Sequence, residues 1–210
     1  MTLRTVLLAA LAAGIASCGG EDAETPADEV TDAEKLAPQA PKAEVAAEPA
    51  TSGALTAEGW ENLRIGMTKD EIAAAYGADA NPNAVGGPEP DVCDEFHPEN
   101  APDGMRVMLT DGRLARITIG RDAKVKTGEG LGLGASAREV KDAYGDAAEI
   151  MPHKYAAAPA EYITVWDKDR PESYITDDSA RGLRYVVGKD GTVEQIHAGG
   201  PAIQLVEGCL

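Results

Sequence analysis

The sequence has few aromatic residues, and none of them lies near the amino terminus. It contains two Trp, six Tyr and one Phe among 210 residues, and the first of these is Trp60. Aromatic side chains supply much of the area that a hydrophobic core buries. We therefore expect no folded core in the first quarter of the chain.

Basic residues are also scarce. The chain has 19 Lys and Arg against 36 Asp and Glu, which gives a formal net charge of −17. Such a polyanion is repelled by nucleic-acid phosphates and by anionic lipid surfaces. The charge argues against a nucleic-acid partner, and it is typical of a soluble domain that faces the cell envelope.

The apolar run at the amino terminus is too short to cross a bilayer, which needs about 20 residues. It extends over Val6–Ala16, follows Arg4 and ends in small residues. This arrangement predicts a secretory signal peptide that is removed on maturation. The alternative interpretation is an amino-terminal membrane helix.

The end of this run, Ile15-Ala16-Ser17-Cys18, resembles the lipobox of bacterial lipoproteins. The resemblance implies a signal peptide over residues 1–17, cleavage after Ser17, and acylation (palmitate among the chains) of Cys18. Several acyl chains form a stable membrane anchor without a transmembrane helix. Because Gly19 stands where an Asp would resemble an inner-membrane retention signal, the outer membrane is favoured over the inner membrane.

Residues 18–55 have the composition of a tether. They are rich in Ala, Pro, Glu and Asp, and they show no apolar periodicity. Such a segment cannot bury enough surface to offset the entropy of ordering it, so we expect disorder. We interpret it as a spacer that holds the folded domain away from the membrane; the alternative is an acidic tail that binds a partner.

An internal repeat organises the remainder of the chain. Residues 63–77 realign with residues 131–145, which lie 68 positions later. Thr68 and Ser136 are hydroxyl N-caps, and a Glu follows each of them by three residues, as in a capping box. Each copy therefore predicts a short helix, with an inward stripe and a glycine in a left-handed cap at its end. The stripes are Ile72, Ala75 and Tyr76 in the first copy and Val140, Ala143 and Tyr144 in the second, and the glycines are Gly77 and Gly145.

Strand-like segments follow each helix. In both halves the last two segments are joined by Asp-Gly, which is a hairpin signal. These hairpins realign 79 rather than 68 positions apart, so we place an insertion at Arg170–Ala180. The expected strands are 92–97, 105–110 and 114–119 in the first half, and 162–167, 183–187 and 193–197 in the second.

The order of helix and antiparallel strands, with the turn Gly66-Met67-Thr68 and residues 71–77, resembles the β-lactamase inhibitor protein fold and outer-membrane-assembly lipoproteins of the SmpA/OmlA type. The resemblance implies an α+β fold, a tandem repeat of a short helix packed on a three- or four-stranded antiparallel sheet. We expect repeats at 56–125 and 126–210 that form one compact unit.

Two cysteines remain once Cys18 is acylated. An even number of cysteines in an exported domain favours a disulfide, here between Cys93 and Cys209. Closing so long a loop is worth about 4 kcal/mol in the chain-entropy treatment. The alternative is a catalytic cysteine, which needs a nearby histidine and a thiol that stays reduced.

No motif for catalysis, a cofactor or a metal stands out. Gly130–Ala135 matches the dinucleotide fingerprint G-x-G-x-x-(G/A), but no apolar strand precedes it, so we interpret it as the turn before the second helix. His97, His153 and His197 lack the spacing of metal ligands. We interpret the acidic pairs, such as Asp94-Glu95, as solvated faces. We therefore predict no enzyme activity and no cofactor.

One candidate binding loop remains, at His153, Lys154 and Tyr155. These side chains offer hydrogen-bonding, cationic and stacking contacts beside an Ala/Pro-rich run. The alternative is an ordinary hairpin connection. We expect a lipid-anchored envelope protein that binds another protein or a surface or cell-wall ligand without catalysis. The alternatives are a hydrolase of envelope polymers and an assembly factor for outer-membrane proteins.

Overall fold

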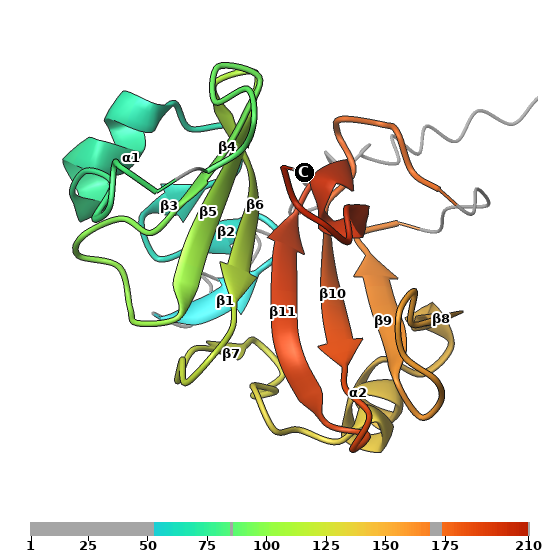
Figure 1. Cartoon of the computed structure of the whole chain (residues 1–210). Helices are drawn as coiled ribbons and strands as arrows, with labels where there is room; N and C mark the ends of the chain where they lie inside the picture. The colour runs from blue at the N-terminus through green and yellow to red at the C-terminus, as the bar shows by residue number, and fades with distance from the viewer. Residues whose placement is uncertain (1–52, 85, 169–173, 210) are drawn as a thin grey trace, which may run out of the picture. The chain divides into compact units, whose positions relative to one another are not determined.

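The computed structural model describes residues 53–84, 86–168 and 174–209 (Figure 1). The predicted signal peptide, the predicted acylation site Cys18, most of the predicted tether and the start of the predicted insertion lie outside the described residues. No helix among the described residues is long and apolar enough to span a bilayer.

The fold is α+β, as predicted, with more sheet than helix. Its α-helices among the described residues are α1, Lys69–Tyr76, and α2, Ala137–Tyr144. Two short 3₁₀ turns complete the helical part, η1 at Gly145–Ala147 and η2 at Pro201–Gln204.

A seven-stranded antiparallel sheet forms the main layer, in the order β4-β5-β6-β11-β10-β9-β8. We expected three or four strands in each half, and β6 pairs with β11 so that both sets join in one sheet (Figure 1). The six expected strands are confirmed to within two residues, while β8 was not predicted. The strands are β4 Cys93–Phe96, β5 Met105–Thr110, β6 Arg113–Ile119, β8 Glu149–Pro152, β9 Glu161–Trp166, β10 Gly182–Val187 and β11 Val193–Gly199.

A smaller four-stranded sheet, in the order β3-β2-β1-β7, was also not predicted. Its strands have two or three residues each, which is too short for an alternating pattern to be recognised. They are β1 Ala54–Thr56, β2 Gly59–Trp60, β3 Leu63–Arg64 and β7 Lys126–Thr127, and β1 pairs with β7 in parallel.

Both helices begin with the predicted capping box. The N-cap hydroxyl of Thr68 accepts from the Glu71 N–H, and the Glu71 carboxylate accepts from the Thr68 N–H at 2.8 Å; Ser136 and Glu139 make the same exchange. The predicted stripes were wrong at Ala75 and Ala143, which are exposed. A helix of only two turns packs with its i and i+4 positions, which leaves the i+3 position free.

The glycines that end the helices have positive φ, as predicted, but neither is in the left-handed helical conformation. Gly77 has φ 83° and ψ 169°, and Gly145 has φ 53° and ψ −128°. Each still donates its N–H to the carbonyl four residues earlier. The extended ψ turns the chain out of the helix toward the next segment.

The core lies on one face of the large sheet, where both helices and the small sheet cover it. We call this the core face. It includes Leu55, Ile72 and Val140 from the covering elements. The large sheet contributes alternate side chains, including Met105, Val107, Ile117, Ile119, Ile163, Tyr185 and Ile196. Residues between these positions must therefore point to the opposite face.

Main-chain hydrogen bonds tie the start of each helix to a strand of the large sheet. In both cases a glycine donates to the strand, and the strand donates back to the residue after that glycine. The bonds are Gly66 N to Leu114 O and Leu114 N to Met67 O, both 2.7 Å, and Gly134 N to Val193 O (2.9 Å) and Val193 N to Ala135 O (2.8 Å).

Candidate functional site

The face of the large sheet opposite the core carries a row of polar residues that crosses six strands. Each member is the cross-strand partner of the next, so all of them point to the same side. The row is Arg106, Thr118, His197, Arg184, Thr164 and Glu149. We call these residues, with Glu95, Arg116, Tyr162 and Gln195, the polar face.

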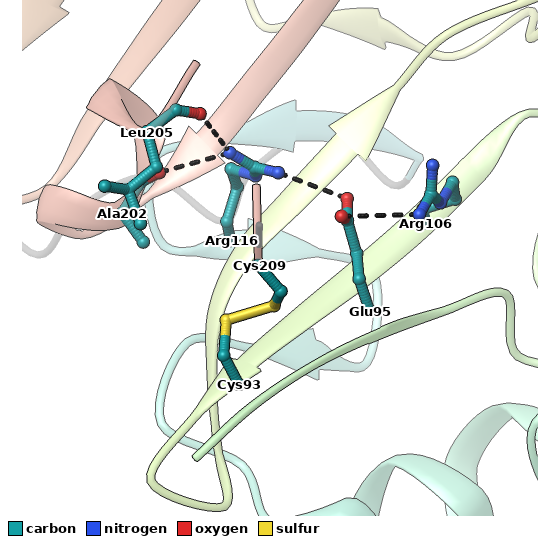
Figure 2. The surroundings of a disulfide bond; sticks show 7 residues. All are labelled: Cys93, Glu95, Arg106, Arg116, Ala202, Leu205 and Cys209. Carbon is teal, nitrogen blue, oxygen red and sulfur yellow. Dashed lines mark hydrogen bonds and ion pairs between the residues drawn. A yellow bond between two sulfur atoms is a disulfide. The ribbon is translucent and has the colours of Figure 1, made fainter. Parts of the chain in front are cut away.

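The last residues of the described chain lie over this polar face. We call residues 200–209 the C-terminal strap. The disulfide Cys93–Cys209 fixes its end to β4, with the two Cα atoms 5.4 Å apart (Figure 2). The disulfide predicted from the sequence is thus confirmed, and it holds the strap on the sheet.

Arg116 joins the sheet, the strap and β4. Its Nη1 donates to the carbonyls of Ala202 (3.3 Å) and Leu205 (2.8 Å), and its Nη2 donates to Glu95 at 3.1 Å (Figure 2). The other oxygen of Glu95 pairs with Arg106 at 3.3 Å. Burial lowers the pKa of Arg116 and Glu95 opposes that shift, but a guanidinium remains charged in proteins. A charge that is only 3% exposed is therefore held by one carboxylate and two carbonyls.

Arg184 is the second buried arginine of the polar face, and it is 4% exposed. Its Nη1 donates to the carbonyls of Gln204 (3.0 Å) and Ile203 (3.5 Å), and its guanidinium lies 3.9 Å from the ring centroid of Tyr162. Among the described residues it has no carboxylate partner. Burial, and then the nearby charge of Arg116, lower the pKa of Arg184.

In the polar row, His197 lies between Thr118 and Arg184. Its Nδ1 is 3.0 Å from the hydroxyl of Thr118. Burial, followed by the positive charges of Arg116 and Arg184, holds the pKa of His197 well below its usual value. The imidazole is therefore neutral at pH 7, and the potential around it is positive.

The buried His197 gives a pH-dependent stability. Because its pKa is lower in the folded than in the unfolded chain, protonation favours unfolding, and stability falls as pH drops below about 6.5 by up to about 1.4 kcal/mol per pH unit. We expect His197→Gln to lack this contribution. Urea unfolding of both proteins from about pH 7.5 to pH 5.5 measures the difference. Parallel stability curves would contradict the burial of a neutral His197.

Two cavities open on the polar face on either side of the strap. The larger, about 870 Å³, is lined by Glu95, Arg106 and Arg116, and we call it the Arg116 cavity. The smaller, about 210 Å³, is lined by Arg184, and we call it the Arg184 cavity. Both share Gln195, His197 and Val206. The two cavities therefore meet at His197 of the polar row and at Val206 of the strap.

The predicted binding loop connects β8 to β9. His153 stacks on Tyr162 with 4.7 Å between ring centroids, and its Nδ1 accepts from the Tyr155 N–H at 3.1 Å. Both His153 and Tyr155 line the Arg184 cavity. Lys154 instead pairs with Glu207 of the strap at 3.2 Å. The structure thus brings two of the three residues to a cavity and uses the third to hold the strap.

Asp94 and Glu95 are not the solvated pair that we expected. Successive residues of a strand face opposite sides of the sheet. Asp94 therefore pairs with Lys69 at 2.7 Å on one side of β4, and Glu95 binds Arg106 and Arg116 on the other.

His97 has its Nδ1 2.7 Å from the carbonyl oxygen of Met105, and it lines the Arg116 cavity. Within the described ranges no cluster of His, Cys, Asp or Glu is arranged to bind a metal ion.

Arg116, Thr118 and Arg184 were not predicted from the sequence as site residues. Each alternates with apolar neighbours in its strand, and this pattern predicts a residue on a solvated face. The strap covers Arg116 and Arg184, and no local pattern indicates which segment will cover a sheet. The available signal was the distant disulfide, which brings the end of the chain to β4.

Comparisons with known proteins add little to this description. No protein-family model and no curated protein matches the chain. A solved structure of a DUF4309 family protein, YjgB from Bacillus subtilis subsp. subtilis str. 168, is 18% identical, with a TM-score of 0.36, over 63% of this chain and 78% of that chain. At this TM-score the likeness carries no argument about fold or function.

Proposed function

We propose that the protein is a lipid-anchored component of the bacterial cell envelope that binds a ligand on its polar face without catalysis. The observation that carries the proposal is the polar face itself, where two cavities are lined by buried polar side chains outside the core: Arg116 in one, Arg184 in the other, and His197 in both. A concave site with a few placed polar groups is the usual form of a ligand site. The ligand is an envelope protein or a surface or cell-wall molecule.

The lipobox-like Ile15-Ala16-Ser17-Cys18 supports the anchor and a location at the outer membrane. The acidic segment that follows acts as the tether between the anchor and the folded domain. A tether raises the effective concentration of the domain near the membrane and lets the polar face search for its ligand.

We also propose that the folded domain is a tandem repeat. The main-chain bonds before α1 and α2 support this, because Gly66 and Gly134 are 68 positions apart and their partners Leu114 and Val193 are 79 apart. These are the two offsets at which the sequence realigns. A further pair fits the first offset: Tyr76 donates to Glu61 at 3.0 Å, and Tyr144 donates to Glu129 at 2.6 Å. Two related halves that share one sheet would place the polar face across their junction.

The geometry favours binding over hydrolysis. Among the described residues, His197 has Thr118 on its Nδ1 and no carboxylate to orient it as a general base. Glu95 has one oxygen on Arg116 and the other on Arg106, so neither is free to exchange a proton. These groups can bind and orient a ligand, but they do not form an acid/base pair.

Photo-crosslinking tests the proposal on the full-length protein in a host with an outer membrane. A photoreactive residue at Tyr155, which is 62% exposed beside the Arg184 cavity, should capture a specific product. The matched control is Ile150, which is 52% exposed and is paired with Ile163 of the core face. Cys18→Ser should remove the protein from the membrane fraction and reduce the Tyr155 product, because the tether no longer concentrates the domain.

The position at which the crosslinked product forms decides whether the ligand site lies on the polar face. A product formed equally at Tyr155 and Ile150 would contradict a ligand site on the polar face. Normal processing and membrane recovery of Cys18→Ser would contradict the lipid anchor.

A further inference from the structure

Arg184 is a buried cation that lacks a counter-ion among the described residues. Arg116, in a similar position, pairs with Glu95, whereas the partners of Arg184 in the described part of the chain are two carbonyls of the strap and the ring of Tyr162. Its Nε, like that of Arg116, is completely buried without a hydrogen-bond acceptor among the described residues. A buried charge without an opposite charge is costly to a fold, and a polar group left without a partner adds to that cost. An anionic group beside Arg184 would supply the missing opposite charge.

The Arg184 cavity offers space for such a group. At about 210 Å³ it is small, and its polar lining consists mainly of groups that can donate a hydrogen bond: Arg184, His153, His197, Tyr155 and Gln195. Since Nη1 is used by the strap, Nη2 is the guanidinium nitrogen left to donate into the cavity that Arg184 lines. Ile203 and Leu205 supply an apolar wall that would pack on a short aliphatic stem.

The charges around the cavity favour an anion of low charge. Arg116 and Arg184 together make the potential at His197 positive. Glu194 also lines the cavity, and the chain as a whole carries −17. The guanidinium attracts an anion and Glu194 repels it, and the repulsion between the ligand and Glu194 grows with each further negative charge on the ligand. A planar carboxylate also matches the fork of a guanidinium.

We propose that the Arg184 cavity binds the carboxylate of a small acid or of a chain-terminal residue, with Arg184 as its counter-ion. This deepens the proposed function, on which it rests, by naming the chemical group that the polar face recognises. Tyr155 and His153 at the rim place the rest of the ligand toward the β8–β9 loop.

The test is a titration of the full-length protein in detergent, with ¹⁵N-labelled arginine. N-acetylalanine should shift the Nε–H signal of Arg184 saturably, and its neutral amide should bind at least about tenfold more weakly, since the charge-assisted pair is lost. Arg184→Lys assigns the signal and should weaken binding by a similar factor. Phosphate should bind more weakly than N-acetylalanine.

The exposed residue Glu194 provides a second variant, whose result does not depend on whether Arg184→Lys folds. Glu194→Gln should tighten binding of N-acetylalanine by about threefold, because it removes a negative charge from the cavity lining. Asp142→Asn, an exposed change of the same kind on α2, outside the polar face and both cavities, should leave the affinity unchanged. Equal binding of acid and amide, tighter binding of phosphate, or no gain with Glu194→Gln would overturn the carboxylate site. A Tyr155-specific crosslink that persists in that case would leave the proposed function standing.

Discussion

Reduction of the Cys93–Cys209 disulfide lowers the free energy of unfolding by about 4 to 5 kcal/mol, the largest single effect that we expect. The bond closes a loop between residues 116 positions apart. In the chain-entropy treatment the bond restricts the unfolded chain, and the restriction grows with loop length. For a domain of this size the melting temperature should fall by roughly 10 to 20 °C.

Cysteine variants distinguish the loss of the disulfide from any other effect of the reducing agent on stability. Cys93→Ala should be as destabilising as the double variant with Cys209→Ala, because either change breaks the bridge. Reducing agent should lower the melting temperature of the wild type, measured by circular dichroism, and should leave that of the double variant unchanged. Two reactive thiols in the denatured, unreduced protein taken from the envelope would contradict the bond.

Arg116→Met should destabilise the fold by about 3 to 5 kcal/mol, although it keeps most of the side-chain volume. The change leaves the carbonyl of Leu205 without its donor and removes the buried partner of Glu95. The carbonyl of Ala202 loses one of its two donors and keeps the N–H of Leu205. Buried acceptors without partners cost more than the average hydrogen bond is worth. Urea unfolding of the oxidised protein gives the free energy directly.

Arg106→Gln is the matched control for this prediction. Its side chain is 48% exposed and binds the same carboxylate, so the loss should stay within about 1 kcal/mol. A double-mutant cycle of Arg116→Met with Glu95→Gln should show strong coupling, because the two charges compensate each other. If Arg116→Met costs no more than Arg106→Gln, the strap does not depend on Arg116.

The elements with strong local signals were predictable. The capping boxes at Thr68 and Ser136 define where each helix begins, and the Asp-Gly turns define both hairpins. These signals act within a few residues, so they can be recognised without knowledge of the fold. The short strands β1, β2, β3 and β7 have no such signal, since they form only when the surrounding core holds them.

The candidate site was less predictable, for a different reason. His153 and Tyr155 were identified from their side-chain chemistry, but the cavity they line is completed by Arg184 and by the strap. Arg184 appears in the sequence as one polar residue between the apolar Leu183 and Tyr185. Its burial is a consequence of the covering segment, and such long-range contacts are not encoded in a local pattern.

The pairing of β6 with β11 also limits how the protein can aggregate. Two separate sheets would leave four open strand edges, whereas the joined sheet leaves only β4 and β8. Each of these has four residues, and β8 ends in Pro152, which has no N–H to offer a neighbouring strand. Short edges interrupted by proline resist the addition of a strand from another copy. Joining the sheets thus protects against edge-to-edge association, which the lipid anchor that we propose would otherwise favour by concentrating copies on a membrane surface.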